Sequence, residues 1–596
     1  MHLPRPEYPR PQFVRNEWLN LNGIWTIEFD PGKSGEERKL HESHGFAQKI
    51  TVPFCPESRL SGVAHRDFIE RMYYHRVITV PKAWSGKRVL LHFGAVDYDC
   101  KVFVDGKFAG RHVGSSDSFC FDITRLAKPG RRQHLVVEVA DELRSWVQTG
   151  GKQSQRYDSY GCAYTRTTGI WQTVWLEATN PRAIEYIQIR PDLDGKQFVF
   201  LPEYHAVEAG DVIAVTAYSQ DGRRVMGQAT AAAANGVPVV VPLKKAMPWE
   251  PGSPYLYQLR YELRDSKGVL LDEVYSYAGL RKVSIVGDQF LLNNKPIFQR
   301  LVLDQGFYPD GIWTAPSDDA LRHDIELSMA AGFNGARLHQ KVFEPRFHYW
   351  ADKLGYLTWG ETPSWGVAFL SGASTPYTAA IAFEGVSNLL HEWREVVERD
   401  YNHPSIIAWS PTNETYPATN EPLFRRLVTE IYDVTKQLDP TRPCNECSGY
   451  HHVKTDLWTV HFYRKNVAEL KEAMEPAEAP VGSLTPKFEL SAYKGQPYIN
   501  DEFGGFLYLP PKLTGRFADN TWGYHGIEIK SDEQFHDMIA EQVRYMVDLP
   551  QCCGFCYTQL TDIEQEQNGV LTYDRVPKIP LEMLRDAFGY KGARDE

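Results

Sequence analysis

The stretch SDDALRHDIELSMAAGFNGARLH (317–339) indicates the fold of the C-terminal half of the chain. Its first part, 317–332, has the pattern of a helix, and GARLH (335–339) has the pattern of a short strand. The same alternation continues outward in both directions from residue 281 to the end of the sequence. Further helical stretches are SNLLHEWREVVERDY (387–401), TEIYDVTKQLD (429–439) and DEQFHDMIAEQVRYMVD (532–548).

Eight strand-like runs alternate with these helical stretches, which is the count of a (β/α)₈ (TIM) barrel. We therefore predict a barrel domain over 281–596. Its functional residues should lie at the C-terminal ends of the strands, where that fold places its sites. The runs are FQRLVL (298–303), GARLH (335–339), YLTWGE (356–361), SIIAWSPTNE (405–414), PCNECSG (443–449), DLWTVHFY (456–463), PYINDEF (497–503) and GFCYTQL (554–560).

Residues 1–280 show short alternating runs without helical stretches, a pattern that predicts β-sandwiches. VFVDGKFAG (102–110) has the strand–Asp-Gly–strand form of a β-hairpin. We predict a jelly-roll-like sandwich over 1–182 and a smaller, immunoglobulin-like sandwich over 183–280.

The composition excludes several classes of protein. The net charge is −11 with no block of Lys and Arg, so no nucleic-acid partner is expected. No apolar run reaches the roughly 18 residues of a membrane span, and the start lacks an apolar secretory segment. Cys444 and Cys447 have CxxC spacing without a second spaced pair, so the nine cysteines are expected to be reduced and to bind no metal. We expect a cytoplasmic protein.

Two glutamates lie at the ends of non-adjacent strand runs. Glu414 ends the fourth run and Glu502 lies at the end of the seventh. A barrel would bring these ends together across its mouth, and glycoside hydrolysis with retention needs two carboxyl groups about 5 Å apart. Position alone does not distinguish such a pair from two solvated carboxylates.

Longer motifs around the two glutamates add to this pattern. NHPSIIAWSPTNE (402–414) and PYINDEFGG (497–505) resemble the two signature regions of glycoside hydrolase family 2, the β-galactosidase/β-glucuronidase family. The resemblance extends over nearly the whole chain. WLNLNGIWTIEFD (18–30) and TTGIWQTVWLEA (167–178) resemble the family's N-terminal sugar-binding-type sandwich, and LLNNKPIFQRL (291–301) resembles its entry into the barrel.

The resemblance implies a role for each matching residue. Glu414 matches the acid/base and Glu502 the nucleophile, while Asn413 would hold the sugar 2-hydroxyl. Tyr463 matches the family's tyrosine that hydrogen-bonds the nucleophile. Arg337 matches an arginine that supports it electrostatically.

His461 stands two residues before Tyr463 on the same side of the sixth run. It is expected either to meet a sugar hydroxyl or to be a structural histidine.

The chain departs from the family pattern at three places. It reads His339-Gln340 where the family usually has Ser-His. Asp304 and Gln305 stand near the first strand where many members have Asn-Arg-His. Tyr557 stands where many have a Trp floor for the sugar. We therefore predict that Gln340, Asp304 and Tyr557 change which sugar the pocket recognises.

Two further motifs bear on the sugar and on metal. The stretch 561–575 has no lysine and two glutamates, whereas the family's β-glucuronidases use Asn-x-Lys there, so a glucuronidase is disfavoured. GETPSWG (360–366) lacks the Glu-x-His of metal-dependent members, so no metal or other cofactor is expected. Trp365 in this segment either lines the sugar subsite or packs within its loop.

These features predict a retaining exo-glycosidase whose partner is a glycoside substrate. The glycone expected from the family is a terminal β-galactoside or a related sugar, including a galactofuranoside or an arabinoside. The alternatives are a β-glucuronidase or β-mannosidase, and, from another class, a non-catalytic carbohydrate-binding protein. The presence of Glu414, Glu502, Asn413 and Tyr463 disfavours the last. Members often form homo-oligomers, but no interface is identified.

Overall fold

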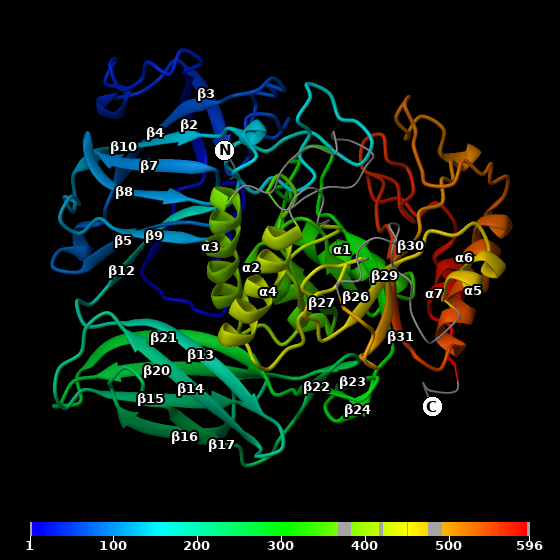
Figure 1. Ribbon diagram of the computed structural model, residues 1–596. Coiled ribbons are helices and arrows are strands. Elements are labelled where there is room, and N and C mark those ends of the chain that lie inside the picture. The colour runs from blue at the N-terminus through cyan, green and yellow to red at the C-terminus, as the bar shows by residue number, and fades with distance from the viewer. Residues whose placement is uncertain (1–2, 368–382, 416–420, 450, 475–490, 593–596) are drawn as a thin grey trace.

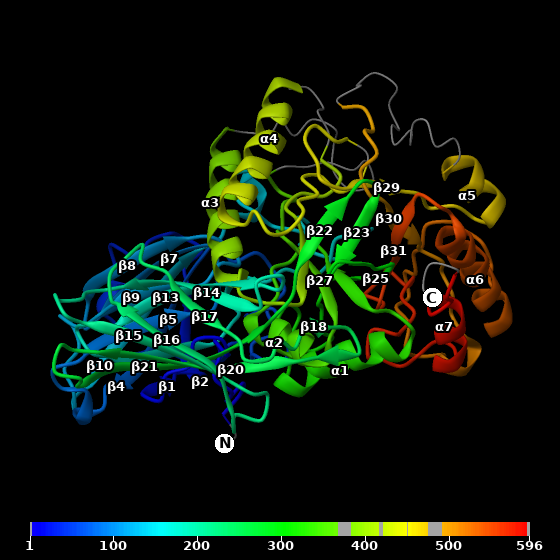
Figure 2. The ribbon, with the colours of Figure 1, turned by 90° about the horizontal axis from the view of Figure 1, so that it is seen from below.

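The computed structural model describes residues 3–367, 383–415, 421–449, 451–474 and 491–592. Two β-sandwiches lie along one side of an α/β barrel (Figure 1). Figure 2 shows the same arrangement from below, with the sandwiches at the left and the barrel helices α5, α6 and α7 at the far right. The predicted combination of two sandwiches and a TIM barrel is confirmed. We keep 1–182, 183–280 and 281–596 as proposed domain bounds.

The first sandwich has a six-stranded sheet in the order β3-β2-β4-β10-β7-β8 and a four-stranded sheet in the order β1-β12-β5-β9. The predicted hairpin is β7–β8. Asp105 and Gly106 connect its strands with φ of 49° and 72°, the positive values that a tight two-residue turn requires. The strands are β1 (Trp18–Asn20), β2 (Gly23–Phe29), β3 (Gln48–Val52), β4 (Arg71–Thr79), β5 (Arg88–Phe93), β7 (Asp99–Val104), β8 (Lys107–Val113), β9 (Phe119–Asp122), β10 (Arg132–Ala140) and β12 (Val174–Thr179), with β6 (Val96–Asp97) paired to β11 (Gly169–Ile170).

The second sandwich packs the sheet β13-β14-β17 against the sheet β16-β15-β20-β21. Trp249 is buried and donates from Nε1 to the backbone carbonyl of Asp352 at 2.7 Å, which joins this sandwich to the barrel. The strands are β13 (Ile184–Asp192), β14 (Gln197–Tyr204), β15 (Val212–Tyr218), β16 (Val225–Ala232), β17 (Val239–Pro242), β20 (Leu256–Arg264) and β21 (Leu270–Gly279). Short pairs follow: β18 (Trp249–Glu250) with β19 (Ser253–Pro254), and β22 (Val283–Val286), β23 (Gln289–Leu292) and β24 (Lys295–Pro296).

The barrel sheet is parallel and runs in the order β28-β27-β26-β25-β31-β30-β29. Seven of the eight predicted runs form its strands: β25 (Gln299–Asp304), β26 (Gly335–Leu338), β27 (Leu357–Glu361), β28 (Ile406–Ser410), β29 (Trp458–His461), β30 (Tyr498–Gly504) and β31 (Cys552–Thr558).

The fifth predicted run, 443–449, is extended but is not a regular strand. It forms single bridges, Trp409 with Cys444 and Asn413 with Ser448. Pro443 has no N–H to donate, which interrupts the ladder at its start. The run still lies between β28 and β29, because Asn445 accepts a hydrogen bond from Thr459 at 3.2 Å. It therefore completes the ring of eight with an irregular segment.

The predicted helices are present, and the second and third of them begin earlier than the sequence pattern indicated. Ser317 caps the first helix by accepting from the backbone N–H of Ala320, and Asp318 and Asp319 in its first turn complement the helix dipole. The helices are α1 (Asp318–Ala330), α2 (Pro345–Leu354), α3 (Phe383–Asp400), α4 (Glu421–Leu438), α5 (Val467–Met474), α6 (Asp532–Asp548) and α7 (Leu581–Phe588), with short turns η1 (Leu40–Glu42), η2 (Lys82–Trp84), η3 (Leu143–Ser145) and η4 (Pro511–Leu513). Within the described ranges, no helix is long and apolar enough to cross a membrane.

Helix α3 joins the first sandwich to the barrel. The buried carboxylate of Glu392 accepts hydrogen bonds from Tyr98 Oη, Ser115 N and Thr149 Oγ1 at 2.8–3.0 Å. Thr149 belongs to the long loop 141–168 between β10 and β11. The same loop then reaches the barrel, where Gly150 donates from its backbone to Trp365 O at 2.8 Å. The first sandwich is thereby held with this loop over the C-terminal ends of the barrel strands.

Candidate active site

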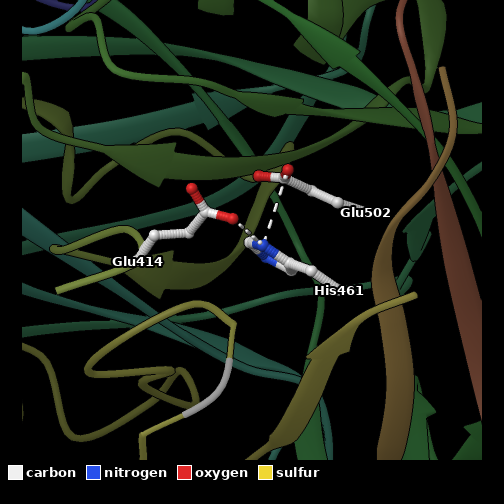
Figure 3. Close-up of side chains that lie close together, drawn as sticks. All are labelled: Glu414, His461 and Glu502. Carbon is white, nitrogen blue, oxygen red and sulfur yellow. Dashed lines mark hydrogen bonds and ion pairs between the residues drawn. The ribbon is translucent and has the colours of Figure 1, made fainter. Parts of the chain in front are cut away.

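Two glutamates and a histidine meet at the C-terminal ends of three barrel strands (Figure 3). Glu414 follows β28, His461 ends β29 and Glu502 lies in β30. One oxygen of each carboxylate and one ring nitrogen of His461 all lie within 4.8 Å of one another. The structure thus brings together the two carboxylates that the sequence singled out.

The Glu502 carboxylate is held by a donor on each oxygen. Arg337 donates from Nη1 to Oε1 at 3.1 Å, and Tyr463 donates from Oη to Oε2 at 2.6 Å. Burial raises the pKa of Glu502, but the positive charges of His461 and Arg337 outweigh it and hold the pKa below its ordinary value. Glu502 is therefore a charged, oriented carboxylate at neutral pH.

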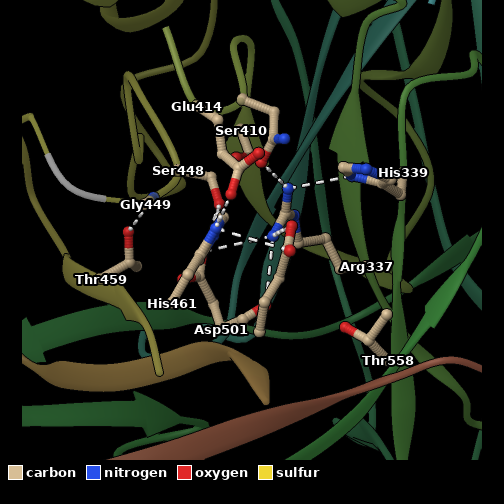
Figure 4. A network of polar contacts seen from close by, with 12 residues as sticks. Arg337, His339, Ser410, Glu414, Ser448, Gly449, Thr459, His461, Asp501 and Thr558 are labelled. Carbon is tan, nitrogen blue, oxygen red and sulfur yellow. Dashed lines mark hydrogen bonds and ion pairs between the residues drawn. The ribbon is translucent and has the colours of Figure 1, made fainter. Parts of the chain in front are cut away.

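Arg337, on β26, connects this carboxylate to its neighbours. Figure 4 shows Arg337 among the polar side chains of the site, with a contact to His339. Its guanidinium is fully buried; Nε donates to Glu361 Oε2 at 2.8 Å, and Nη2 donates to Asn413 Oδ1. Nη2 also lies 3.0 Å from His339 Nδ1. Because the guanidinium is planar and rigid, these contacts fix Glu502 and Asn413 relative to each other.

Glu414 has a backbone conformation that few residues other than glycine adopt. Its φ is 44°, in the left-handed region, and its N–H donates to Ser448 O at 2.8 Å. Such a conformation is retained only where the surroundings impose it, and it is common at functional sites. It directs the side chain toward the pair, where Oε1 shares a hydrogen bond of 2.8 Å with His461 Nδ1.

His461 lies between the two glutamates. Nδ1 contacts Glu414 and lies 3.5 Å from Glu502 Oε2, while Nε2 contacts Ser448 Oγ at 2.9 Å and Asp501 Oδ1 at 3.3 Å. Burial lowers the pKa of His461, but the carboxylates of Glu502, Asp501 and Glu414 raise it to about 10. His461 is therefore an imidazolium that donates on both sides, and neither sequence reading had placed it between the two carboxylates.

The same three side chains could also be read as a metal site. The donors around them favour another use. Arg337 and Tyr463 already donate to both oxygens of Glu502, and His461 Nδ1 shares a hydrogen bond with Glu414. The set is that of a carboxylate pair with its own cation.

Gln340 and Trp365 form the wall beside Asn413. Gln340 accepts from Trp365 N at 3.0 Å and donates from Nε2 to Ser364 Oγ at 3.0 Å, so it orients the loop after β27. Trp365 in turn donates from Nε1 to Asn413 O at 3.1 Å and is 7% exposed. Trp365 therefore lies next to the carboxylate pair, and Gln340 acts on the site through it.

Two predicted residues are not brought to the pair. Asp304 is buried and accepts from Gly306 N at 2.9 Å, and its charged neighbours are Asp324, Arg575 and Lys341 rather than Glu502.

Tyr557 points to the other side of β31, where it packs against Phe503 and Phe588 in the barrel core. Because strand residues alternate in direction, its neighbour Thr558 takes the inward place and contacts Tyr463 Oη at 2.9 Å.

Several residues around the pair were not predicted. Tyr524 stacks on Tyr463 with centroids 4.1 Å apart, and Trp522 adjoins it. From the first sandwich, Tyr164 donates to Glu566, and Lys152 approaches the Trp365 ring at 5.2 Å. The aromatic pair was visible in the sequence as TWGY, but no motif pointed to Tyr164 or Lys152 in the sandwich loop.

Comparison with known proteins gives three matching domain descriptions. "Glycosyl hydrolases family 2, TIM barrel domain" matches residues 283–590, the family's sugar binding domain matches 59–179, and "Glycosyl hydrolases family 2" matches 204–281. The three matches follow the order of the three bodies in the structure.

Individual proteins match over most of the chain. It is 27% identical to a β-glucuronidase of Paenibacillus borealis, over 99% of both chains. It is 25% identical to a β-galactosidase of Thermoanaerobacter pseudethanolicus, over 71% of this chain and 55% of that protein. Among solved structures, the apo β-glucuronidase of Ruminococcus gnavus superimposes with a TM-score of 0.80 at 21% identity, covering 98% of this chain and 100% of that one, which shows likeness of fold.

Proposed function

Because the chain belongs to glycosyl hydrolase family 2 and is thus a glycoside hydrolase, we propose that it hydrolyses a terminal β-glucuronide with retention of configuration. Glu502 is the nucleophile and Glu414 the acid/base. The observation that carries this proposal is the separation of the pair. Oxygens of Glu414 and Glu502 lie within 4.8 Å, close to the ~5 Å of retaining enzymes and well below the 6.5–9.5 Å that leaves room for a water in inverting ones.

In the first step the charged Glu502 attacks the anomeric carbon as the bond to the aglycone oxygen breaks. Arg337 and Tyr463 hold the attacking carboxylate in place. Glu414 gives its proton to the leaving oxygen. Since Oε1 of Glu414 is hydrogen-bonded to His461, Oε2 is the oxygen that carries this proton.

In the second step Glu414, now a carboxylate, takes a proton from water, and the water oxygen attacks the anomeric carbon. The ester bond to Glu502 breaks and the sugar leaves with its original configuration. Asn413, oriented by Arg337 through its Oδ1, has its amide N–H groups to offer to the 2-hydroxyl in both steps.

The choice of a glucuronide rests on relatives. The protein that matches over 99% of both chains carries the name β-glucuronidase. The absence of lysine from 561–575 disfavours this sugar, since a carboxylate there would meet Glu564 and Glu566. A glucuronide therefore requires a cation from elsewhere in the site.

A neutral β-galactoside is the second candidate. Glu566, hydrogen-bonded to Tyr164 and Asn568, is an acceptor suited to sugar hydroxyls. A more distant relative is named β-galactosidase.

Initial rates with p-nitrophenyl glycosides test the proposal. The panel contains the β-glucuronide, β-glucoside, β-galactopyranoside, β-galactofuranoside, α-arabinofuranoside and β-mannoside. We expect the β-glucuronide to be hydrolysed fastest. Faster hydrolysis of a neutral sugar would overturn the glycone and leave the catalytic pair standing, and no hydrolysis of any sugar would favour a carbohydrate-binding protein.

Replacing His461 with asparagine should shift the pH profile. The amide keeps a donor near Glu414 but removes the positive charge that lowers the pKa of Glu502. The pKa of the nucleophile should then rise, so the acidic limb of kcat/KM should move to higher pH by about one unit, with a loss of ~10–100-fold at the optimum. The measurement is kcat/KM against pH.

The control for this variant is His205→Asn, which changes a half-exposed histidine in the second sandwich. It should reproduce the wild-type profile. An acidic limb that stays in place in His461→Asn would show that His461 does not set the charge state of the pair.

A further inference from the structure

The first sandwich places a lysine beside the carboxylate pair. Lys152 lies in the loop between β10 and β11, and the backbone on both sides of it is tied down. Gly151 donates to Trp365 O at 3.0 Å and to Pro363 O at 3.1 Å, while Lys152 O accepts from Tyr164 N at 2.8 Å. The position of this side chain relative to the barrel is therefore fixed.

The approach of the two domains is close at this point. Gly151 has φ of 57°, and a Cβ there would come within 2.4 Å of Gln340 O. Only glycine allows the loop to adopt this conformation against the barrel. The next residue, Lys152, is then directed to Trp365, whose ring centroid lies 5.2 Å from Nζ.

The Lys152 residue is largely buried, and within the described ranges its ammonium contacts no counterion. The residue is 4% exposed, and across the described ranges no hydrogen bond or ion pair to its ammonium is found. Three lysines are buried in the described part of the chain. Lys578 forms an ion pair of 2.7 Å with Asp562, and Lys341 donates to the carbonyls of Gly306 and Trp313 at 2.6 and 2.7 Å. Lys152 alone among them has its donors unused, although burying a cation is costly unless it is paired.

The charges around Lys152 belong to the site. Burial lowers the pKa of its ammonium, but Cys162 and the carboxylates of Glu566, Glu502 and Glu414 raise it above its ordinary value. In return Lys152 lowers the pKa of Glu502. Lys152 is therefore a charged group facing the same space as the carboxylate pair, and none of those carboxylates is close enough to bind it directly.

We propose that Lys152 binds the carboxylate of the glycone and so makes the enzyme selective for uronic acid glycosides. This inference rests on the proposed function and names the residue that recognises the carboxylate of the substrate. A carboxylate on the sugar would accept a charge-assisted hydrogen bond from the Lys152 ammonium. The charge of Lys152 would also offset the repulsion between the sugar carboxylate and Glu566. The Glu566 carboxylate already accepts hydrogen bonds from Tyr164 and Asn568. The lysine missing from 561–575 is thus replaced by a lysine from another domain.

The test compares two substrates that differ only at the position concerned. p-Nitrophenyl β-glucuronide carries a carboxylate where p-nitrophenyl β-glucoside carries a hydroxymethyl group. We expect Lys152→Met to lower the ratio of their kcat/KM values at least about tenfold, mainly through KM for the glucuronide, and Lys152→Arg to keep part of the ratio. Lys107→Met, on an exposed strand of the same sandwich, should keep the wild-type ratio and both rates.

A second measurement does not depend on turnover. Thermal stabilisation by D-glucuronate and by D-glucose is compared in the wild type and in Lys152→Met. Glucuronate should stabilise the wild type more, and the two sugars should act alike on the variant. An unchanged selectivity in Lys152→Met, with the wild type preferring the glucuronide, would overturn the role of Lys152 alone. A wild type that prefers the glucoside would overturn the proposed glycone and this inference together.

Discussion

Glu502→Ala is expected to abolish hydrolysis, with kcat/KM falling on the order of 10⁴-fold or more. The variant removes the atom that attacks the anomeric carbon, and the remaining donors, Arg337 and Tyr463, cannot replace it. The fold should persist, because a smaller side chain leaves both partners in place. The measurement is the rate with the preferred p-nitrophenyl glycoside, beside Glu541→Ala, an exposed glutamate on α6, as the matched control.

Azide distinguishes loss of the nucleophile from general damage. In Glu502→Ala, azide can enter the vacated space and displace the aglycone from the opposite face, with Glu414 still protonating the leaving oxygen. The product should be the α-glycosyl azide, inverted from the β-substrate. Wild-type rates in Glu502→Ala would contradict the assignment, and so would a β-configured azide product.

Glu414→Ala should have the second largest effect, and its size should depend on the leaving group. With an alkyl or methoxyphenyl aglycone, whose oxygen needs a proton to depart, kcat/KM should fall ~10²–10⁴-fold. With a dinitrophenyl aglycone, which leaves without a proton, the loss should be far smaller. The measurement is kcat/KM across a series of aglycones of graded basicity.

Rescue by azide gives the opposite stereochemistry in this variant. Here the covalent intermediate on Glu502 still forms, and azide attacks it in place of the water that Glu414 would activate. The product should be the β-glycosyl azide, with configuration retained overall. Equal losses for all aglycones would contradict a role in proton transfer, as would a lack of rescue.

Much of the barrel could be predicted because its strands are short apolar runs between helices, a local pattern. The fifth run shows the limit. PCNECSG (443–449) reads as a strand, but Pro443 cannot donate a hydrogen bond, and the polar side chains of Asn445 and Ser448 bond to Thr459 and Asp501 instead. The segment keeps its place in the ring without a regular ladder.

Site residues could be predicted where they follow or end a strand. They could not be predicted where their place in the site depends on which face of the strand the side chain occupies. Glu414 and Glu502 met as expected. Tyr557 and Thr558 are adjacent on β31, and which of them points inward depends on the strand's register, which the sequence does not specify.

The residues that make the contacts between domains could not be identified from the sequence. Lys152 lies more than two hundred and fifty residues before either glutamate in the chain, in a loop whose position depends on Gly151 packing against Gln340. Only the packing of two domains places it beside the pair. The polar partners of Glu392 on α3 could not be predicted from the sequence for the same reason.

The most direct test of the central claim is to trap the covalent intermediate. The enzyme is incubated with 2-deoxy-2-fluoro-β-D-glucuronyl fluoride, whose fluorine at C2 slows both steps while fluoride remains a good leaving group, and its tryptic peptides are fragmented in a mass spectrometer. The galactosyl analogue is run beside it, so that a wrong glycone is not mistaken for a wrong mechanism. We predict the sugar on Glu502 within the peptide 495–512, on Glu502 rather than Asp501. A sugar attached to any other residue, or turnover of both reagents to inverted products without a labelled peptide, would contradict the account.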